Sequence, residues 1–400
     1  ALPHAMQLAG CVFGPALMLL IALYTMHVNL LLVECHRMVV FTDTAATSNT
    51  HRPEPSPSSY AQTTFSGLCE AVLGRPGKIV GAVNLLLMQV FACAAFFTFV
   101  GRNLTAAMHS WGFEIVDFRT VVILFGILAS GSTLLTDIGF LKTTFIFGNI
   151  AVLISLITIM TYAIPSFSFE NLPVETTLPQ LTVFFSMSVY TFNGIGEVLP
   201  ISSSMEDTAK YPKVLACSIG MLYLVYLVFA LAVSGSFGGK TQGMVFDNLE
   251  GPVVAFVKIF HSLAVLCTIP LKYFSGIKDG LVPLLDMMLG PRECVGTSVD
   301  QVNCSLNATI RLGTRLATVV VSVATALLVP DFAFLVALIG GFCVTIVAFI
   351  LPPLMFFVLS LDPRHKFSAL RQLLNGLILA LGVCICVVLT TKNLKDKFFT

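Results

Sequence analysis

Long apolar stretches alternate with shorter polar ones along the whole chain. A helix needs about 20 apolar residues to cross a membrane, and most of these stretches approach or exceed that length. Residues 1–10 are too short to span, so we interpret them as the remaining part of a first helix whose N-terminal half is missing. The predicted spans are 11–32, 79–101, 121–138, 143–163, 181–200, 214–233, 253–274, 316–329, 332–360 and 373–390.

Polar segments predict the connections between these spans. Residues 34–60 are mostly polar and contain three prolines, which predicts a loop. Residues 59–77 are amphipathic and end at Pro-Gly, which predicts a helix lying in the membrane interface. Residues 275–315 form a long, more polar segment after the span that ends at 274.

Composition places the chain in one class. Hydrophobic residues make up 56% of it and charged residues 11%, whereas a soluble domain carries about 25% charged residues. The mean hydropathy is +0.91, so the chain is predicted to be an all-α polytopic membrane protein whose main partner is the lipid bilayer. A net charge of +1 gives no indication of nucleic-acid binding. The 11 cysteines form no CxxC pair, which excludes zinc ribbons and thioredoxin-type redox sites. The sequence predicts no oligomeric state.

The distribution of Lys and Arg predicts the orientation. Cytoplasmic loops carry an excess of Lys and Arg. If the N-terminus is cytoplasmic, most of these residues fall on the cytoplasmic side, with Arg37, Lys210, Lys213, Lys272 and Lys278 among them. Lys258 would then lie inside the eighth span.

One predicted span is interrupted. Asn193-Gly194-Ile195-Gly196 lies in the middle of the apolar stretch 181–200, followed by Glu197 and Leu199-Pro200. Glycine and proline both disfavour a helix interior, and bare backbone is tolerated at membrane depth only inside protein or along a wet cavity. Transporters built on broken helices bind their substrates at such points. The alternative is a kinked helix whose glycines allow close packing.

A short internal echo suggests a repeat. Leu2-Pro3 in the first fragment corresponds to Leu199-Pro200 in the interrupted span, five spans later. This spacing fits an inverted five-plus-five repeat with discontinuous first and sixth helices. We therefore expect one transmembrane domain over residues 1–400, with repeat one at about 1–165, repeat two at about 180–360 and an extra helix at about 369–390.

Three motifs resemble one family. The run Phe192 to Pro200, with Ser204-Met205 and Pro212 after it, is similar to the sixth helix of the amino acid/auxin permease family. Pro330-Asp331-Phe332 and the later Ala348 to Pro352 resemble the family's tenth helix, and Thr268-Ile269-Pro270 its eighth helix in sodium-coupled members. The resemblance covers nearly the whole chain and implies a leucine-transporter-like fold with an additional helix 11. Proton-coupled members usually have an acid directly after the helix-six phenylalanine, whereas Asn193 stands here.

The chemistry of an amino acid favours a substrate site at the interruption. Its carboxylate needs donors and its ammonium needs acceptors, and the ends of half-helices supply free N–H groups and carbonyls. Glycine lets the backbone approach a ligand closely. The predicted substrate contacts are therefore Phe192, Asn193, Gly194, Ile195 and Gly196, with simple packing as the alternative for Phe192.

Four further residues are candidates near this site. Glu197 is expected to bind a proton or the substrate ammonium, unless it lies at a water-exposed end of the break. Thr268 is a candidate sodium ligand, although hydroxyls in spans more often bond their own helix. His261 titrates near neutral pH in principle, with packing as the alternative, and His4 is expected beside the first-helix break.

The resemblance implies secondary active transport of amino acids driven by a proton or sodium gradient. The alternative is an amino acid sensor with the same fold and little transport. We expect no enzyme, because the chain lacks HExxH and Gly-x-Ser-x-Gly motifs, and no cofactor or certain metal site beyond the coupling H⁺ or Na⁺. Both the plasma membrane and an organelle of vacuolar or lysosomal type fit the sequence.

Overall fold

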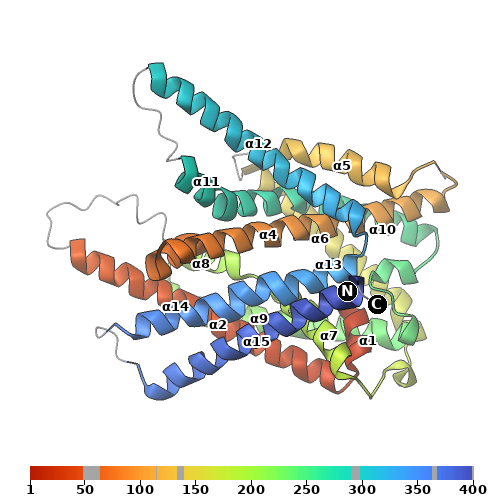
Figure 1. The fold of residues 1–400 in the computed structure, drawn as a ribbon. Coiled ribbons are helices and arrows are strands. Elements are labelled where there is room, and N and C mark those ends of the chain that lie inside the picture. The colour runs from red at the N-terminus through yellow and green to blue at the C-terminus, as the bar shows by residue number, and fades with distance from the viewer. Residues whose placement is uncertain (48–63, 114, 133–138, 290–297, 363–366, 399–400) are drawn as a thin grey trace.

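The computed structural model describes residues 1–47, 64–113, 115–132, 139–289, 298–362 and 367–398, and every regular element in these ranges is a helix. Within them, eight helical segments are long and apolar enough to cross a membrane. They form one bundle, with the two ends of the chain near the same end (Figure 1). The chain is thus an all-helical protein with the composition of a multi-pass membrane protein.

The bounds of the elements follow the hydropathy pattern closely. The candidate span at Phe332–Ser360 coincides with the predicted tenth span and is built from three consecutive helical segments. The α-helices are α1 (Leu2–Ala9), α2 (Phe13–Thr47), α4 (Phe65–Ser110), α5 (Phe118–Ser132), α6 (Gly139–Ala163), α7 (Leu178–Thr191), α8 (Ile195–Ser204), α9 (Tyr211–Phe237), α10 (Pro252–Ser275), α11 (Val282–Leu289), α12 (Ser298–Leu328), α13 (Phe332–Leu338), α14 (Leu351–Ser360) and α15 (Ala369–Phe398). Short 3₁₀ turns are η1 (Ile164–Ser166), η2 (Phe169–Asn171), η3 (Thr208–Lys210), η4 (Gly238–Lys240) and η5 (Val245–Asn248), and π-helical segments are η6 (Gly276–Leu281) and η7 (Ile339–Ile350).

The outer helices present apolar side chains outward. In the apolar stretch of the span that contains α9, only 11% of the residues are buried, against 67% for Phe332–Ser360. Exposed side chains of α9 and α15 include Leu224, Val228, Leu377 and Leu381. A protein in water rarely exposes apolar surface of this extent, so these faces are suited to lipid and the protein is an integral multi-pass membrane protein.

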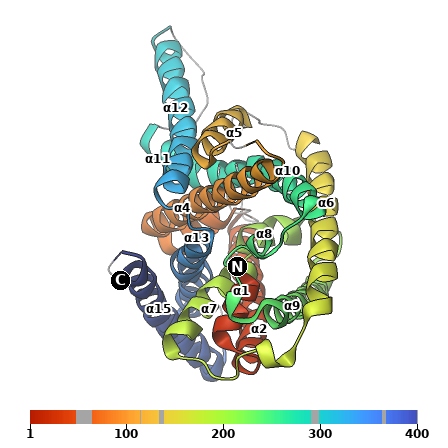
Figure 2. The same ribbon diagram turned by 90° about the vertical axis from the view of Figure 1, so that its right-hand side faces the viewer.

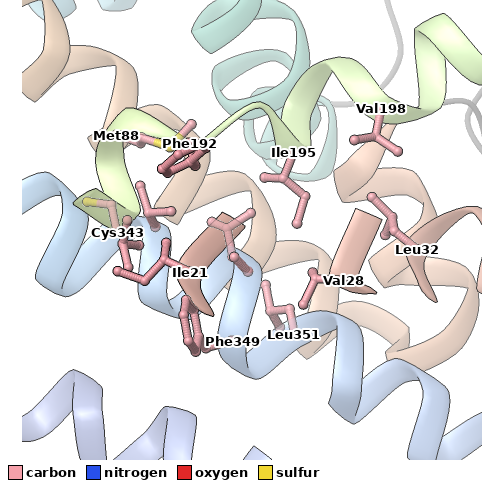
Figure 3. Packing of buried hydrophobic residues seen from close by; sticks show 14 of the residues in the cluster. Ile21, Val28, Leu32, Met88, Phe192, Ile195, Val198, Cys343, Phe349 and Leu351 are labelled. Carbon is pink, nitrogen blue, oxygen red and sulfur yellow. The ribbon is translucent and has the colours of Figure 1, made fainter. Parts of the chain in front are cut away.

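The largest core cluster lies around the short helices. It joins buried residues of α1, α2, α4, α7, α8, η7 and α14, and the end-on view places α1 and α8 inside a ring of longer helices (Figure 2). Figure 3 shows Ile195 and Val198 of α8 facing Val28 and Leu32 of α2, with Leu351 of α14 below. The two parts of the interrupted helix are therefore held by the centre of the bundle.

Two boundaries on the first half of the chain differ from the prediction. The segment 34–60 was predicted as a loop, but α2 continues to Thr47, because residues 34–47 contain neither Pro nor Gly. The interfacial helix predicted at 59–77 begins at Phe65 in the described part and ends at a kink at Gly74, three residues before the predicted end. Gly74 has a φ of +68°, a left-handed conformation that carries no Cβ penalty at glycine. The following span continues directly from this kink within α4.

The largest difference concerns residues 275–315. The polar segment predicted there is helical in its described parts, since α10, η6 and α11 form one span over Pro252–Leu289 and α12 begins at Ser298. Lys272 and Lys278 therefore lie in one continuous helical segment of 38 residues and not in a loop. Three charges within eight residues lowered the local hydropathy, although the helix continues through them and through Gly276 and Gly280.

Candidate functional site

The interruption predicted in the sixth span is present. Helix α7 ends at Thr191 and α8 begins at Ile195, so only Phe192, Asn193 and Gly194 lie outside helical structure. The ribbon between Phe192 and Ile195 is visibly extended (Figure 3). The break is shorter than the run Phe192–Gly196 predicted to contact the substrate, because the Glu197 N–H already donates to the Gly194 carbonyl at 3.0 Å and closes a first turn.

The break leaves backbone groups free on both sides. A helix of any length has unsatisfied N–H groups in its first turn and unsatisfied carbonyls in its last turn. The Ile195 N–H is 3.5 Å from Asn193 Oδ1, which caps α8 at the edge of hydrogen-bonding distance. Pro200 lies inside α8, and since proline has no N–H, the Gly196 carbonyl loses its usual donor four residues on. Donors and acceptors therefore meet within one turn of the break.

Open space adjoins both glycines of the break. A Cβ built on Gly194 or on Gly196 would meet no heavy atom within 4 Å. By contrast, a Cβ on Gly340 of η7 would lie 1.8 Å from the Ser186 carbonyl oxygen of α7. Gly340 is thus a packing glycine, whereas Gly194 and Gly196 leave room beside the backbone, and the close-packing explanation of the motif does not apply to them.

The side chains of the break divide into two groups. Phe192 and Ile195 are 7% and 2% exposed and belong to the core, where the Phe192 ring lies 5.6 Å from that of Tyr226. They can face a ligand only through their backbone. Asn193 is half-buried, and its amide donates to the Met88 sulfur of α4 at 3.2 Å. Asn193, Gly194 and Gly196 are therefore the accessible part of the predicted set.

Glu197 is exposed in the first turn of α8. A carboxylate at this position is favoured by the positive end of the helix dipole. No described Lys or Arg forms an ion pair with it. Its charge instead acts on Asp279 of η6, which is half-buried and sits beside Lys278. The carboxylates of α8 and η6 are therefore close enough for their charges to interact.

His4 connects α1 to an outer loop. Its Nδ1 lies 2.8 Å from the Thr241 carbonyl oxygen, just after η4. The neighbouring Pro3 carbonyl accepts a hydrogen bond from Ser234 of α9 at 2.6 Å. These contacts orient the His4 ring toward the η4 loop, so its observed partner is a backbone carbonyl.

Thr268 and His261 lie on α10 in packed surroundings. Thr268 donates to the Val265 carbonyl at 2.7 Å, which is the intrahelical bond expected of a hydroxyl in a span. The His261 ring lies 5.2 Å from Phe99 and 5.4 Å from Phe246. His261 is therefore part of an aromatic cluster. The hydroxyl oxygen of Thr268 still has lone pairs that can bind a cation.

Three polar residues near the break were missed by the sequence analysis. Lys272 of α10 is half-buried, lies within electrostatic reach of the Cys93 thiol of α4, and makes no ion pair or hydrogen bond with the described part of the chain. Gln89 is 5% exposed and lies against Gly276. Its Oε1 has no hydrogen-bond partner among the described residues. Gln89 lies on α4 and Asp279 on η6, while Lys272 lies on α10. Their only signal in the sequence was charge or amide groups within apolar runs.

The described residues contain no group of three or more His, Cys, Asp or Glu side chains that could hold a metal ion. The ionisable groups of this region include the carboxylates of Glu197 and Asp279 and the ammonium of Lys278, which interacts with Asp279. These groups suit the recognition of small charged solutes or protons.

Comparison with known proteins supplies the family. Residues 1–394 match the family described as transmembrane amino acid transporter protein. The chain is 25% identical to the amino acid transporter AVT3A of Arabidopsis thaliana over 393 residues, covering 96% of this chain and 83% of the relative. It is 23% identical to the amino acid transporter ANT1 of the same plant over 391 residues (95% and 86% coverage) and 24% identical to AVT3C over 422 residues (99% and 87%). The chain therefore belongs to the transmembrane amino acid transporter family, whose members are transporters and not enzymes.

Proposed function

We propose that this protein is a secondary active transporter that carries amino acids by alternating access, with the substrate held at the break between α7 and α8. The observation that carries the proposal is the open space beside Gly194 and Gly196. At that point the first-turn N–H groups of α8 can bind the substrate carboxylate. The Gly196 carbonyl freed by Pro200 and the last carbonyls of α7 can bind its ammonium.

The coupling ion in this proposal is a proton. Glu197 and Asp279 interact as like charges, and two nearby carboxylates that share a proton lose their mutual repulsion. Glu197 lies three residues after Gly194, in the first turn of α8. A change in its protonation state therefore changes the charge beside the N–H groups of that turn. Thr268 and Pro270 would supply a sodium site only after Thr268 gives up its bond to Val265.

The proposed architecture is the five-plus-five repeat with α15 outside it. Helices α1 to α6 correspond to the first repeat and α7 to α14 to the second. In this arrangement, α1 and the α7–α8 pair are the discontinuous elements facing each other at the centre of the bundle. The support is their shared membership of the central core cluster.

Transport and sensing are separated by a counterflow experiment. Purified protein in liposomes preloaded with unlabelled amino acid should accumulate external labelled amino acid, and an imposed inward proton gradient should then drive net uptake without sodium. A sensor would bind the labelled amino acid but show no counterflow. If uptake requires a sodium gradient and does not depend on pH, the coupling role belongs to Thr268 and not to Glu197.

A further inference from the structure

A cavity of about 430 Å³ lies away from the break, between α2 and the junction of α8 with η3. It is lined by Val33, His36, Arg37, Val40, Ser202, Ser203, Thr208 and Ala209. The predicted orientation places this end of the bundle on the cytoplasmic side. Val33, Val40 and Ala209 form the apolar part of its wall. The basic side chains of His36 and Arg37 and three hydroxyl groups supply its polar groups.

Neither His36 nor Arg37 forms an ion pair with an acidic residue among those that the structure describes. Arg37 is exposed, and its described bond is from Nη2 to the Thr208 carbonyl at 3.0 Å, which leaves its other N–H groups available. His36 Nε2 has no hydrogen-bond partner in the part of the chain that the structure describes. The charge of the Arg37 guanidinium is thus not balanced by an acidic side chain in the described part of the chain.

Nearby acidic residues are engaged elsewhere or turned away. Glu34 pairs with Arg371 of α15, and Asp207 pairs with Lys210 at 3.2 Å. Glu206 is exposed and does not line the cavity. The cavity therefore complements an anion, and the guanidinium is the side chain best suited to bind a phosphate with two parallel hydrogen bonds.

We propose that this cavity binds the headgroup of an anionic phospholipid, with the phosphate at Arg37 and His36 and the glycerol and upper acyl chain against Val33 and Val40. Basic pockets between membrane helices on the cytoplasmic side bind such headgroups. Ser203 now donates to the Pro200 carbonyl at 3.1 Å, and its hydroxyl can rotate to the phosphate. The valine wall favours a lipid over a free phosphate.

The occupied cavity would connect the core to the half-helix that carries Glu197. Ser202 and Ser203 belong to α8, and Arg37 belongs to α2. A headgroup that contacts both would hold the inner end of α8 against α2. The lipid would thereby favour the α8 position seen here.

Native mass spectrometry of the purified full chain tests this site. The protein is reconstituted in nanodiscs of phosphatidylcholine with added phosphatidylglycerol, and the lipids retained after release are counted. We expect the wild type to retain phosphatidylglycerol selectively, and R37Q to bind it about fivefold more weakly, the effect of one basic side chain at a membrane surface. K213Q removes an exposed charge outside the cavity lining and should retain lipid as the wild type does.

A second variant guards against a folding defect. A209F keeps both basic side chains and places a ring in the cavity, so it should also lose the retained phosphatidylglycerol. Glycerol 3-phosphate is added in a parallel arm and should not displace the lipid. Equal retention by wild type, R37Q and A209F, or full displacement by glycerol 3-phosphate, would overturn the proposal.

Discussion

The α7–α8 pair and the α10–η6–α11 span contain the same helix-disfavouring residues and respond to them differently. The first has Gly194, Gly196 and Pro200 and breaks, whereas the second has Pro270, Gly276 and Gly280 and remains helical through Leu289. The difference lies in what surrounds the glycines. A Cβ on Gly276 would lie 2.8 Å from Gln89 and one on Gly280 2.9 Å from the Ala82 carbonyl oxygen, while Gly194 and Gly196 face open space.

Glycine therefore has two different structural roles in this protein. In η6, which is π-helical, the glycines let the segment approach α4 closely. Such segments recur at functional sites. At the break it leaves the backbone uncovered where an amino acid can approach. The same residue type thus allows close packing in one span and leaves open space beside the backbone in the other.

The largest expected effect is on folding. Gly280→Ala forces a methyl group against the backbone of α4, which we expect to lower the free energy of unfolding by about 1–3 kcal/mol, the usual cost of overpacking. The melting temperature of the detergent-purified protein measures the change. Gly220→Ala is the control, because its Cβ would meet no atom within 4 Å. An unchanged melting temperature for Gly280→Ala would show that the close packing of η6 against α4 does not need a glycine at this position.

Gly196→Ala should show the opposite behaviour. The added methyl group meets no protein atom, so the melting temperature should stay near that of the wild type. It would occupy the space proposed for the substrate, and we expect amino acid counterflow to fall by about tenfold, which corresponds to ~1.4 kcal/mol of binding. Wild-type counterflow in this variant would mean that no substrate uses that space.

Glu197→Gln separates coupling from binding. Without an ionisable group at this position, counterflow should persist, because exchange needs no gradient. Accumulation driven by a proton gradient should be lost. Asp279→Asn should give a weaker version of the same loss, since Asp279 is the partner on η6. Gradient-driven uptake by Glu197→Gln at the wild-type level would exclude this carboxylate from coupling.

The smallest effect is expected at Lys272. Lys272→Met keeps a long side chain and removes an ammonium that has no ion pair in the described residues. Burying an unpaired charge is costly, so the melting temperature should stay the same or rise. If Lys272 attracts the substrate carboxylate, the KM for uptake should rise severalfold with little change in maximal rate. A fall in melting temperature would instead assign Lys272 a structural role.

The sequence predicted the spans and the position of the break, because both depend on local properties. Hydropathy located Phe332–Ser360, and Asn193-Gly194 marked the break itself. The sequence analysis failed where contacts between residues distant in the chain determine the structure. The α4 packing surface and the helical continuation past Lys272 and Asp279 depend on neighbours distant in the chain, which single-sequence hydropathy does not contain.

The individual side-chain roles were the hardest to predict. Phe192 and Ile195 pack into the core, and His261 lies among aromatic rings. Each fits both a binding and a packing pattern in sequence, since apolar and aromatic residues serve both purposes. Only the surroundings distinguish Gly194 from Gly280.

The most direct test of the central claim is amide hydrogen exchange at the break. Exchange of the peptide that covers residues 192–198 is measured in the purified protein with and without a transported amino acid. If the substrate binds the N–H groups of α8, these amides should exchange more slowly in its presence, while peptides of η6 change little. Unchanged exchange at 192–198 under conditions of saturating, transport-competent binding would contradict the account.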